Sequence, residues 1–125
     1  MRVAVYGTLR KGQSNHSVLE DSPKVGELRQ KLNYSMWDYN GWYPILTSSS
    51  KPSWLTLEVY SVNDRIFEAL DFLEGYPVLY DRRLETIYGE DTYIYFMENL
   101  KGKQGATPIP SGDWVSYRES LLGYG

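Results

Sequence analysis

The sequence contains no cysteine and a single histidine, His16, among its 125 residues. The lack of cysteine excludes disulfide bonds and thiol chemistry. A structural zinc site needs several cysteine or histidine ligands, and one histidine cannot supply them. We therefore expect a fold that is stabilised by its hydrophobic core and has no metal site.

Long apolar runs and dense basic runs are also missing. No apolar stretch is long enough to span a bilayer, and no signal peptide precedes the first expected strand. The net charge is −3, and the basic residues are scattered along the chain, which argues against binding to nucleic acid or to an anionic membrane. We expect a soluble cytoplasmic protein that is a monomer or a homodimer.

Aromatic residues are abundant, with 12 tyrosines and 4 tryptophans. These side chains combine a large contact area with a polar tip, which suits strands or a lined cavity. The length fits one domain, 1–125. Many short strand-like segments accompany one well-defined helix, and this pattern indicates an α+β fold with a small curled or closed mixed sheet.

The expected strands are separated by turn signals. They lie at residues 3–5, 25–28, 32–39, 42–46, 54–60, 82–88 and 92–97. The serine-rich segment 47–52 is predicted to be a polar surface loop. One short helix is predicted after Ser14 or Asn15, through roughly Glu20, and a last one starts at Ser111 or Asp113.

Residues 6–16, with the sequence YGTLRKGQSNH, follow the first apolar strand and organise the rest of the chain. Gly7 and Gly12 let the backbone bend tightly and come close to a ligand. A strand that ends in such a turn exposes several backbone N–H groups, which together can bind a carboxylate or a phosphate. Many strand-to-helix turns contain glycine and bind nothing, so both interpretations stay open.

Helical signals are clearest from Asn63, a capping residue, to Glu74, which is followed by Gly75 as a stop. At about 100° per residue, Glu68 and Asp71 point away from the apolar side of this helix, whereas Glu74 lies on that side. Burial and the negative end of the helix dipole both raise the pKa of a carboxyl placed there. Glu74 is therefore a candidate general base near neutral pH.

A frayed last turn would instead let Glu74 reach water. Tyr80 is a candidate for lining a pocket, and Arg82 or Arg83 for pairing with Glu74 or with an anionic substrate. A position on the surface of a strand is the alternative for each of these three residues. His16 has no evident partner in the sequence, so we expect it to cap or hydrogen-bond rather than to catalyse.

Two motifs closely resemble those of the gamma-glutamylcyclotransferase superfamily. Residues 6–16 are most similar to the gamma-glutamylamine cyclotransferase branch, with the same Tyr-Gly-Thr-Leu start and Gly-Gln-x-Asn-His ending. Residues 70–77, LDFLEGYP, and 80–82, YDR, resemble the family segment Leu-Asp-x-x-Glu-x-x-Pro…Tyr-x-Arg, in which the Glu is catalytic. Residues 55–60 and 112–114 also fit family positions, so the resemblance spans nearly the whole chain in the right order.

The resemblance implies a small mixed β-barrel of about five to seven strands, flanked by two or three short helices. It also implies an intramolecular reaction. The α-amine of a gamma-glutamyl group attacks its own gamma-carbonyl and releases 5-oxoproline with a free amine or amino acid. This chemistry needs no metal and no cofactor, and the implied partner is a small gamma-glutamyl molecule.

The family's site residues carry over by position. Glu74 is the implied catalytic residue, which takes a proton from the α-ammonium and delivers one to the leaving amine. The implied substrate-binding residues are Tyr6, Gly7, Thr8, Leu9 and Tyr80, and the candidates for supporting roles are Arg10, Asn15 and Arg82. Backbone N–H groups around Gly7, Thr8 and Leu9 would hold the substrate α-carboxylate or the developing oxyanion.

An alternative is a non-catalytic binding module of the same fold that sequesters a small anionic metabolite. Loss of the acid/base residue would favour this alternative, and Glu74 is present. The sequence does not select one amine substrate, because variable loops within the family admit dipeptides, glutathione or isopeptide-linked lysine. Resemblance to the gamma-glutamylamine branch favours gamma-glutamyl-ε-lysine.

Overall fold

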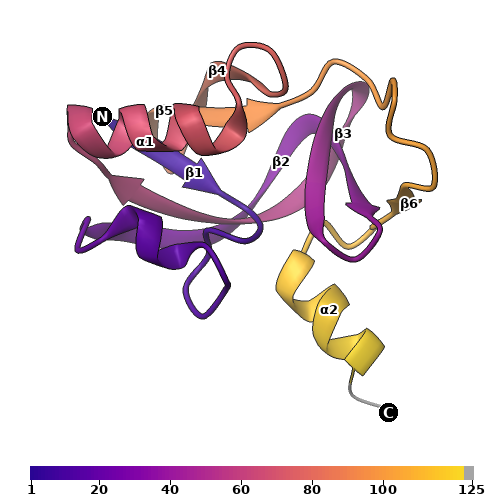
Figure 1. The fold of residues 1–125 in the computed structure, drawn as a ribbon. Coiled ribbons are helices and arrows are strands. Elements are labelled where there is room, and N and C mark those ends of the chain that lie inside the picture. Colours follow the sequence, from indigo (N-terminus) through magenta and orange to yellow (C-terminus); the bar gives the residue numbers. More distant parts are fainter. Residues whose placement is uncertain (123–125) are drawn as a thin grey trace.

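The computed structural model describes residues 1–122 and contains one six-stranded sheet that curls into a half-barrel, with two α-helices (Figure 1). In chain order the elements are β1 (Arg2–Val5), the 3-10 helix η1 (His16–Leu19), β2 (Lys24–Tyr39), β3 (Tyr43–Ser61), α1 (Asp64–Glu74), β4 (Asp81–Ile87), β5 (Glu90–Phe96), β6 (Thr107–Pro108) and α2 (Trp114–Leu122). The strand order is β4-β5-β1-β3-β2-β6, with β1 parallel to β5 and antiparallel to β3. The predicted α+β class with a mixed sheet is confirmed.

The prediction that residues 47–52 form a surface loop is wrong, because β3 runs through them. Thr47 pairs with Ser35 of β2, and Ser48 pairs with Tyr34. On the other side, Thr47 forms a parallel bridge with Met97, just after β5. Polar composition favours a loop locally, but Thr47 and Ser48 pair with β2 on one side and with the Met97 backbone on the other, which satisfies their N–H and C=O groups and keeps this part extended. Residues 49–52 lie within the register shift opposite Leu32 and Tyr34 and have no partner residue in the β2–β3 ladder.

A register shift between Leu32 and Tyr34 interrupts the long β2–β3 ladder. Such an irregularity bends a strand and increases its twist. The two strands predicted at 25–28 and 32–39 are therefore one bent strand, β2. Beyond the register shift, Thr47 of β3 forms the bridge to Met97 just after β5, and the sheet curls into a half-barrel (Figure 1).

Apolar side chains cover both faces of the sheet. Along β1, Val3 and Val5 belong to the cluster that packs under α1, whereas Ala4 belongs to the cluster inside the half-barrel. This alternation follows from the two-residue period of a strand. From α1, Ile66, Phe67 and Leu70 pack into the first cluster. The second cluster includes Trp114 at the start of α2, so each helix seals one part of the core.

Helix α1 has the predicted bounds, and its ends have physical causes. The Asn63 side chain accepts a hydrogen bond from the Ile66 N–H at 2.8 Å, which caps the first turn. At the other end Gly75 has φ 65°, in the left-handed region, and its N–H donates to the Phe72 carbonyl at 3.1 Å. These two caps fix Glu74 as the last helical residue.

Helix α2 projects away from the sheet, and its last turn lies far from the start of β1 (Figure 1). The Asp113 carboxylate accepts the Ser116 N–H at 3.1 Å, which confirms the predicted start of this helix. Within residues 1–122, neither helix has the length and apolar character needed to cross a membrane.

Candidate active site

The first loop, residues 6–15, joins β1 to η1 and is stabilised by hydrogen bonds within itself. The Arg10 N–H donates to the Gly7 carbonyl at 3.0 Å, and the Asn15 N–H donates to the Thr8 carbonyl at 2.8 Å. The Asn15 side-chain amide also donates to Thr8 Oγ1 at 2.9 Å. The sequence predicts Ser14 or Asn15 as the cap of the short helix that follows. The Asn15 side chain makes no such capping hydrogen bond and instead holds the first loop closed.

Three backbone N–H groups of the first loop are left for a ligand. Those of Gly7, Thr8 and Leu9 have no hydrogen-bond acceptor among residues 1–122. The Leu9 carbonyl, by contrast, lies 2.9 Å from His16 Nδ1, which confirms the predicted hydrogen-bonding role of the histidine. Adjacent backbone N–H groups without acceptors form a site for a carboxylate or an oxyanion.

Gly7 is needed for the close approach of the first loop to β3. A Cβ atom placed on Gly7 would lie 2.3 Å from Cγ of Pro44 and 2.7 Å from its Cδ. Only glycine leaves room for the Pro44 ring against the backbone of the first loop. Gly7 and Pro44 both line the same cavity, so this contact sets the position of one of its sides.

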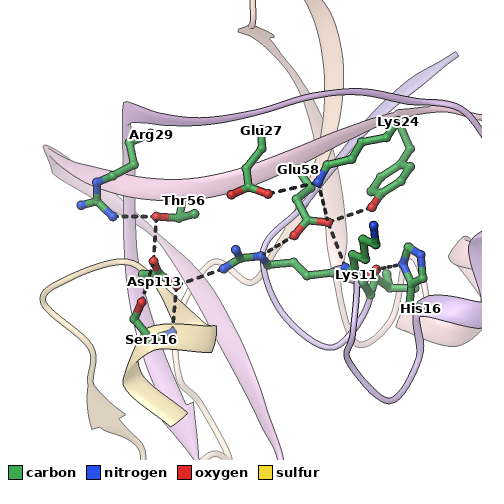
Figure 2. A network of polar contacts seen from close by, with 12 residues as sticks. Lys11, His16, Lys24, Glu27, Arg29, Thr56, Glu58, Asp113 and Ser116 are labelled. Carbon is green, nitrogen blue, oxygen red and sulfur yellow. Dashed lines mark hydrogen bonds and ion pairs between the residues drawn. The ribbon is translucent and has the colours of Figure 1, made fainter. Parts of the chain in front are cut away.

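A buried ion-pair network anchors the end of the first loop (Figure 2). Arg10 Nε donates to Glu58 at 2.9 Å, and Arg10 Nη1 donates to Asp113 at 3.0 Å. The Lys11 N–H and the Tyr60 hydroxyl also donate to Glu58, at 2.9 and 2.8 Å. Burial acts to raise the pKa of Glu58, but these donors outweigh it and hold the pKa below its usual value.

Glu74 enters the site from the last turn of α1. Its side chain is partly buried and lines the cavity beside the first loop. Burial raises the pKa of Glu74 from 4.5 to about 7, because the ionised carboxylate loses hydration. A carboxyl with this pKa is half ionised near neutral pH, which suits a group that both takes up and releases a proton.

Three tyrosines surround Glu74. The Tyr6 hydroxyl donates to the Tyr95 carbonyl at 2.8 Å, and the Tyr80 hydroxyl donates to the Pro44 carbonyl at 3.1 Å. Burial raises the pKa of Tyr6 and Tyr80 well above the ordinary value, with the nearby Glu74 charge contributing. Both hydroxyls therefore stay protonated, and they serve as neutral walls and hydrogen-bonding groups.

Arg82 does not reach Glu74. Its guanidinium pairs with Asp71, with Nε 2.9 Å from Oδ1, and stacks on the ring of Tyr76 at 4.0 Å. The Tyr95 hydroxyl donates to the same Asp71 carboxylate at 2.7 Å. The prediction that Asp71 points away from the packed side is therefore wrong, because β4 and β5 bring donors to it.

These elements enclose a cavity of about 240 Å³. Such a volume is below that of typical drug-sized pockets and suits a small metabolite. Besides Glu74, the three tyrosines and the first-loop residues Gly7, Thr8, Leu9, Ser14 and Asn15, the lining comprises Ala4, Val5, Trp42, Tyr43, Pro44, Leu73 and Leu79.

Most of the predicted site residues meet in this cavity. Those that line it are Glu74, Tyr6, Gly7, Thr8, Leu9, Tyr80 and Asn15. Arg10 and Arg82 lie outside the lining, and each is held in an ion pair. Sequence reasoning missed Pro44, Tyr95 and the three apolar residues Trp42, Leu73 and Leu79. Tyr95 could have been suspected only from the parallel pairing of β1 with β5, which brings it beside Tyr6.

Comparison with known proteins identifies the family to which the chain is similar. The sequence matches the family described as "Gamma-glutamyl cyclotransferase, AIG2-like" over residues 3–116. A Vibrio cholerae protein named "Putative gamma-glutamylcyclotransferase" is 38% identical over 113 residues, which are 90% of this chain and 93% of the relative. The human "Gamma-glutamylaminecyclotransferase" is 31% identical over 90 residues, 64% of this chain and 57% of that protein.

A solved structure shares the fold over the full length. An uncharacterized protein from Pyrococcus horikoshii superposes with a TM-score of 0.81 at 25% sequence identity, covering 99% of this chain and 98% of the other. The resemblance seen in the two sequence motifs is thus confirmed over nearly the whole chain. This protein belongs to the gamma-glutamyl cyclotransferase, AIG2-like family.

Proposed function

We propose that the protein is a gamma-glutamyl cyclotransferase that acts on gamma-glutamylamines. The α-amine of the glutamyl group attacks the gamma-carbonyl carbon, a five-membered ring closes, and the bond to the leaving amine breaks. The products are 5-oxoproline and the free amine. The main support is that Glu74, from the second sequence motif, and Gly7, Thr8 and Leu9, from the first, line one cavity.

Glu74 acts as general base and then as general acid. The substrate α-ammonium must lose a proton before its lone pair can attack, and the ionised Glu74 carboxylate accepts that proton. The α-ammonium loses two protons overall on becoming the ring N–H, and the leaving amine gains two and departs as an ammonium ion. Because the pKa of Glu74 is about 7, neither uptake nor release of the proton is strongly uphill at neutral pH.

The first loop holds the negative charge. The N–H groups of Gly7, Thr8 and Leu9 are directed to the α-carboxylate or to the oxyanion that develops on the gamma-carbonyl oxygen. Tyr6 and Tyr80 restrict the space for the glutamyl chain, so that amine and carbonyl lie close enough to react. Arg10 supports the loop from behind through Glu58 and Asp113, without contacting substrate.

Two relatives support the reaction class. The name of the Vibrio cholerae relative specifies gamma-glutamyl cyclotransfer, and that of the human relative specifies gamma-glutamylamines. We propose gamma-glutamylamines as the substrates of this chain too, because the volume of the cavity suits a small glutamyl group and its exposed lining residues leave room for an amine.

The test is release of 5-oxoproline from a panel of gamma-glutamylamines, gamma-glutamyl dipeptides and glutathione, with Glu74→Gln as the control variant. We expect turnover by the parent protein and none by Glu74→Gln. If the parent releases nothing from any compound, but one compound raises its melting temperature and survives unchanged, the protein is a binding module instead. Turnover that persists in Glu74→Gln would leave the reaction intact and remove Glu74 as its base.

A further inference from the structure

The exposed part of the cavity lining, here called the mouth, is mainly apolar. Besides Ser14, it comprises Trp42, Leu73 and Leu79, whose exposed fractions are 65%, 39% and 46%. They come from three different segments, namely the β2–β3 turn, the last turn of α1 and the loop after α1. Large apolar side chains that gather at one opening mark a binding surface. Here that surface continues into the cavity that contains Glu74.

Charged side chains are scarce in the same cavity. Among its lining residues within the part of the chain described, Glu74 is the only Asp, Glu, Lys, Arg or His. Arg10 and Arg82 are held in ion pairs, and the Lys103 ammonium lies 5.1 Å from the centre of the Tyr39 ring. None of these three cations lines the cavity, so none is placed to balance a further negative charge there.

We propose that the leaving amine of the substrate is apolar and carries no charged group of its own, as in a gamma-glutamyl alkylamide or arylalkylamide. This inference rests on the proposed function and narrows its substrate class. Under the proposed function the glutamyl end occupies the polar groups, with its α-ammonium at Glu74 and its α-carboxylate or the developing oxyanion at the N–H groups of the first loop. What is left for the amine is the apolar surface of Trp42, Leu73 and Leu79, with Ser14 as the one exposed polar lining residue among those described.

The physical reason is the cost of moving a charge out of water. A gamma-glutamyl amino acid carries an extra carboxylate beyond the scissile bond, and gamma-glutamyl-ε-lysine carries an extra carboxylate together with an ammonium group. At the mouth of this cavity that carboxylate would lose hydration without gaining a cation, which is unfavourable. An alkyl or aryl group in the same place is stabilised by burial of its apolar surface.

A matched pair of substrates isolates this effect. Gamma-glutamyl-phenethylamide and gamma-glutamyl-phenylalanine share the glutamyl group, the amide and the aromatic ring, and the second has one additional carboxylate. We expect kcat/KM for 5-oxoproline release to be at least about tenfold higher for the phenethylamide. Equal values, or a higher value for gamma-glutamyl-phenylalanine, would overturn the inference while leaving the cyclotransferase reaction in place. If neither of these compounds nor any compound of the wider panel released 5-oxoproline, both the proposed cyclotransferase reaction and this inference would be wrong.

A cationic side chain introduced at the mouth should reverse the preference for the phenethylamide over gamma-glutamyl-phenylalanine. Leu79→Lys places an ammonium among the lining residues, and we expect it to bring kcat/KM for gamma-glutamyl-phenylalanine to or above that for the phenethylamide. Val78→Lys is the matched control, because Val78 is the adjacent residue, is 94% exposed and does not line the cavity. It should keep the parent preference. An equal response to both substitutions would point to overall charge and overturn the assignment of Leu79.

A second copy of the chain is the other candidate occupant of this surface. Sedimentation of the parent and of Leu79→Lys decides between the two. Under our proposal the oligomeric state of both proteins is the same, and only substrate preference changes. If Leu79→Lys instead dissociates a dimer and leaves the ratio of the two kcat/KM values unchanged, the apolar mouth is a subunit interface and the inference is wrong.

Discussion

The Tyr80 N–H donates to the Glu74 carbonyl at 3.2 Å. This bond closes the turn after α1, so that both side chains enter the cavity from one short segment. The Tyr80 hydroxyl then donates to the Pro44 carbonyl of β3, and Pro44 packs against Gly7. The position of the proposed base is therefore coupled to the first loop through Tyr80 and Pro44.

The activity should show an acidic limb set by Glu74. We expect kcat/KM to rise with pH and level off above an apparent pKa of about 7, because only the ionised carboxylate accepts the substrate proton. The measurement is 5-oxoproline release from about pH 5 to about pH 9. A limb near 4.5, the ordinary value for glutamate, would show that Glu74 is hydrated in solution and not desolvated as the structure places it.

The ionisation of Glu74 should lower the stability of the folded protein as the pH rises, whereas it raises the activity. Its pKa is higher in the folded than in the unfolded protein, so the folded state binds the extra proton between about pH 4.5 and about pH 7. Stability is therefore lost as the pH rises through that window, by up to about 3 kcal/mol.

Urea unfolding of the parent and of Glu74→Gln at both ends of this window measures the effect. The glutamine variant should lack this loss and be more stable than the parent at the higher pH. Glu68→Gln, on the exposed face of the same helix, should follow the parent. If Glu74→Gln and the parent lose stability in parallel, another group is responsible.

The sequence predicts those features of the fold and of the candidate site that are determined by neighbouring residues in the chain. Asn63 and Gly75 end α1 through bonds to their own helix, and the position of Glu74 follows from the helical period, so the sequence alone is sufficient. The extended conformation of Thr47 and Ser48 depends on pairing with Met97 and with β2, whereas the serines of this segment predict a loop. Pairing between distant segments is the information that the sequence does not display.

The two arginines illustrate the same limit. Arg10 is adjacent to the ligand loop in the chain, which suggests contact with substrate, yet its partners Glu58 and Asp113 lie 48 and 103 residues away. Arg82 follows Glu74 closely, but the register of β4 turns it to Asp71. A long side chain reaches whichever counter-charge the tertiary fold brings near, so its role cannot be predicted from its neighbours in sequence.

Removing Arg10 should destabilise the protein strongly. Arg10→Met leaves the buried Glu58 without its main cation, and breaking a buried pair in this way costs about 3 kcal/mol or more. Urea unfolding measures the loss. Arg65→Ala removes the exposed pair with Glu20 and should change stability far less, because a solvent-exposed ion pair contributes little. Equal effects of the two substitutions would contradict a buried anchor.

The Arg10 pair also predicts an activity effect. Because the pair holds the first loop, Arg10→Met should raise KM more than it lowers kcat, and Arg10→Met/Glu58→Gln should recover part of the stability that the single change loses. The readouts are steady-state release of 5-oxoproline and urea unfolding of the double variant. A large loss of kcat with unchanged KM would place Arg10 in the chemical step instead.

Gly7 should tolerate no larger side chain while Pro44 is present. In Gly7→Ala the new methyl group would overlap Cγ and Cδ of Pro44, so the loop must shift, at a cost of about 1–3 kcal/mol. We expect kcat/KM to fall by about tenfold or more, because the shift moves the N–H groups of the first loop away from the substrate. Pro44→Ala removes both overlapping atoms, so Gly7→Ala/Pro44→Ala should be more active and more stable than Gly7→Ala alone. If the second substitution gives no recovery, the cost arises from the backbone of Gly7 and not from its contact with Pro44.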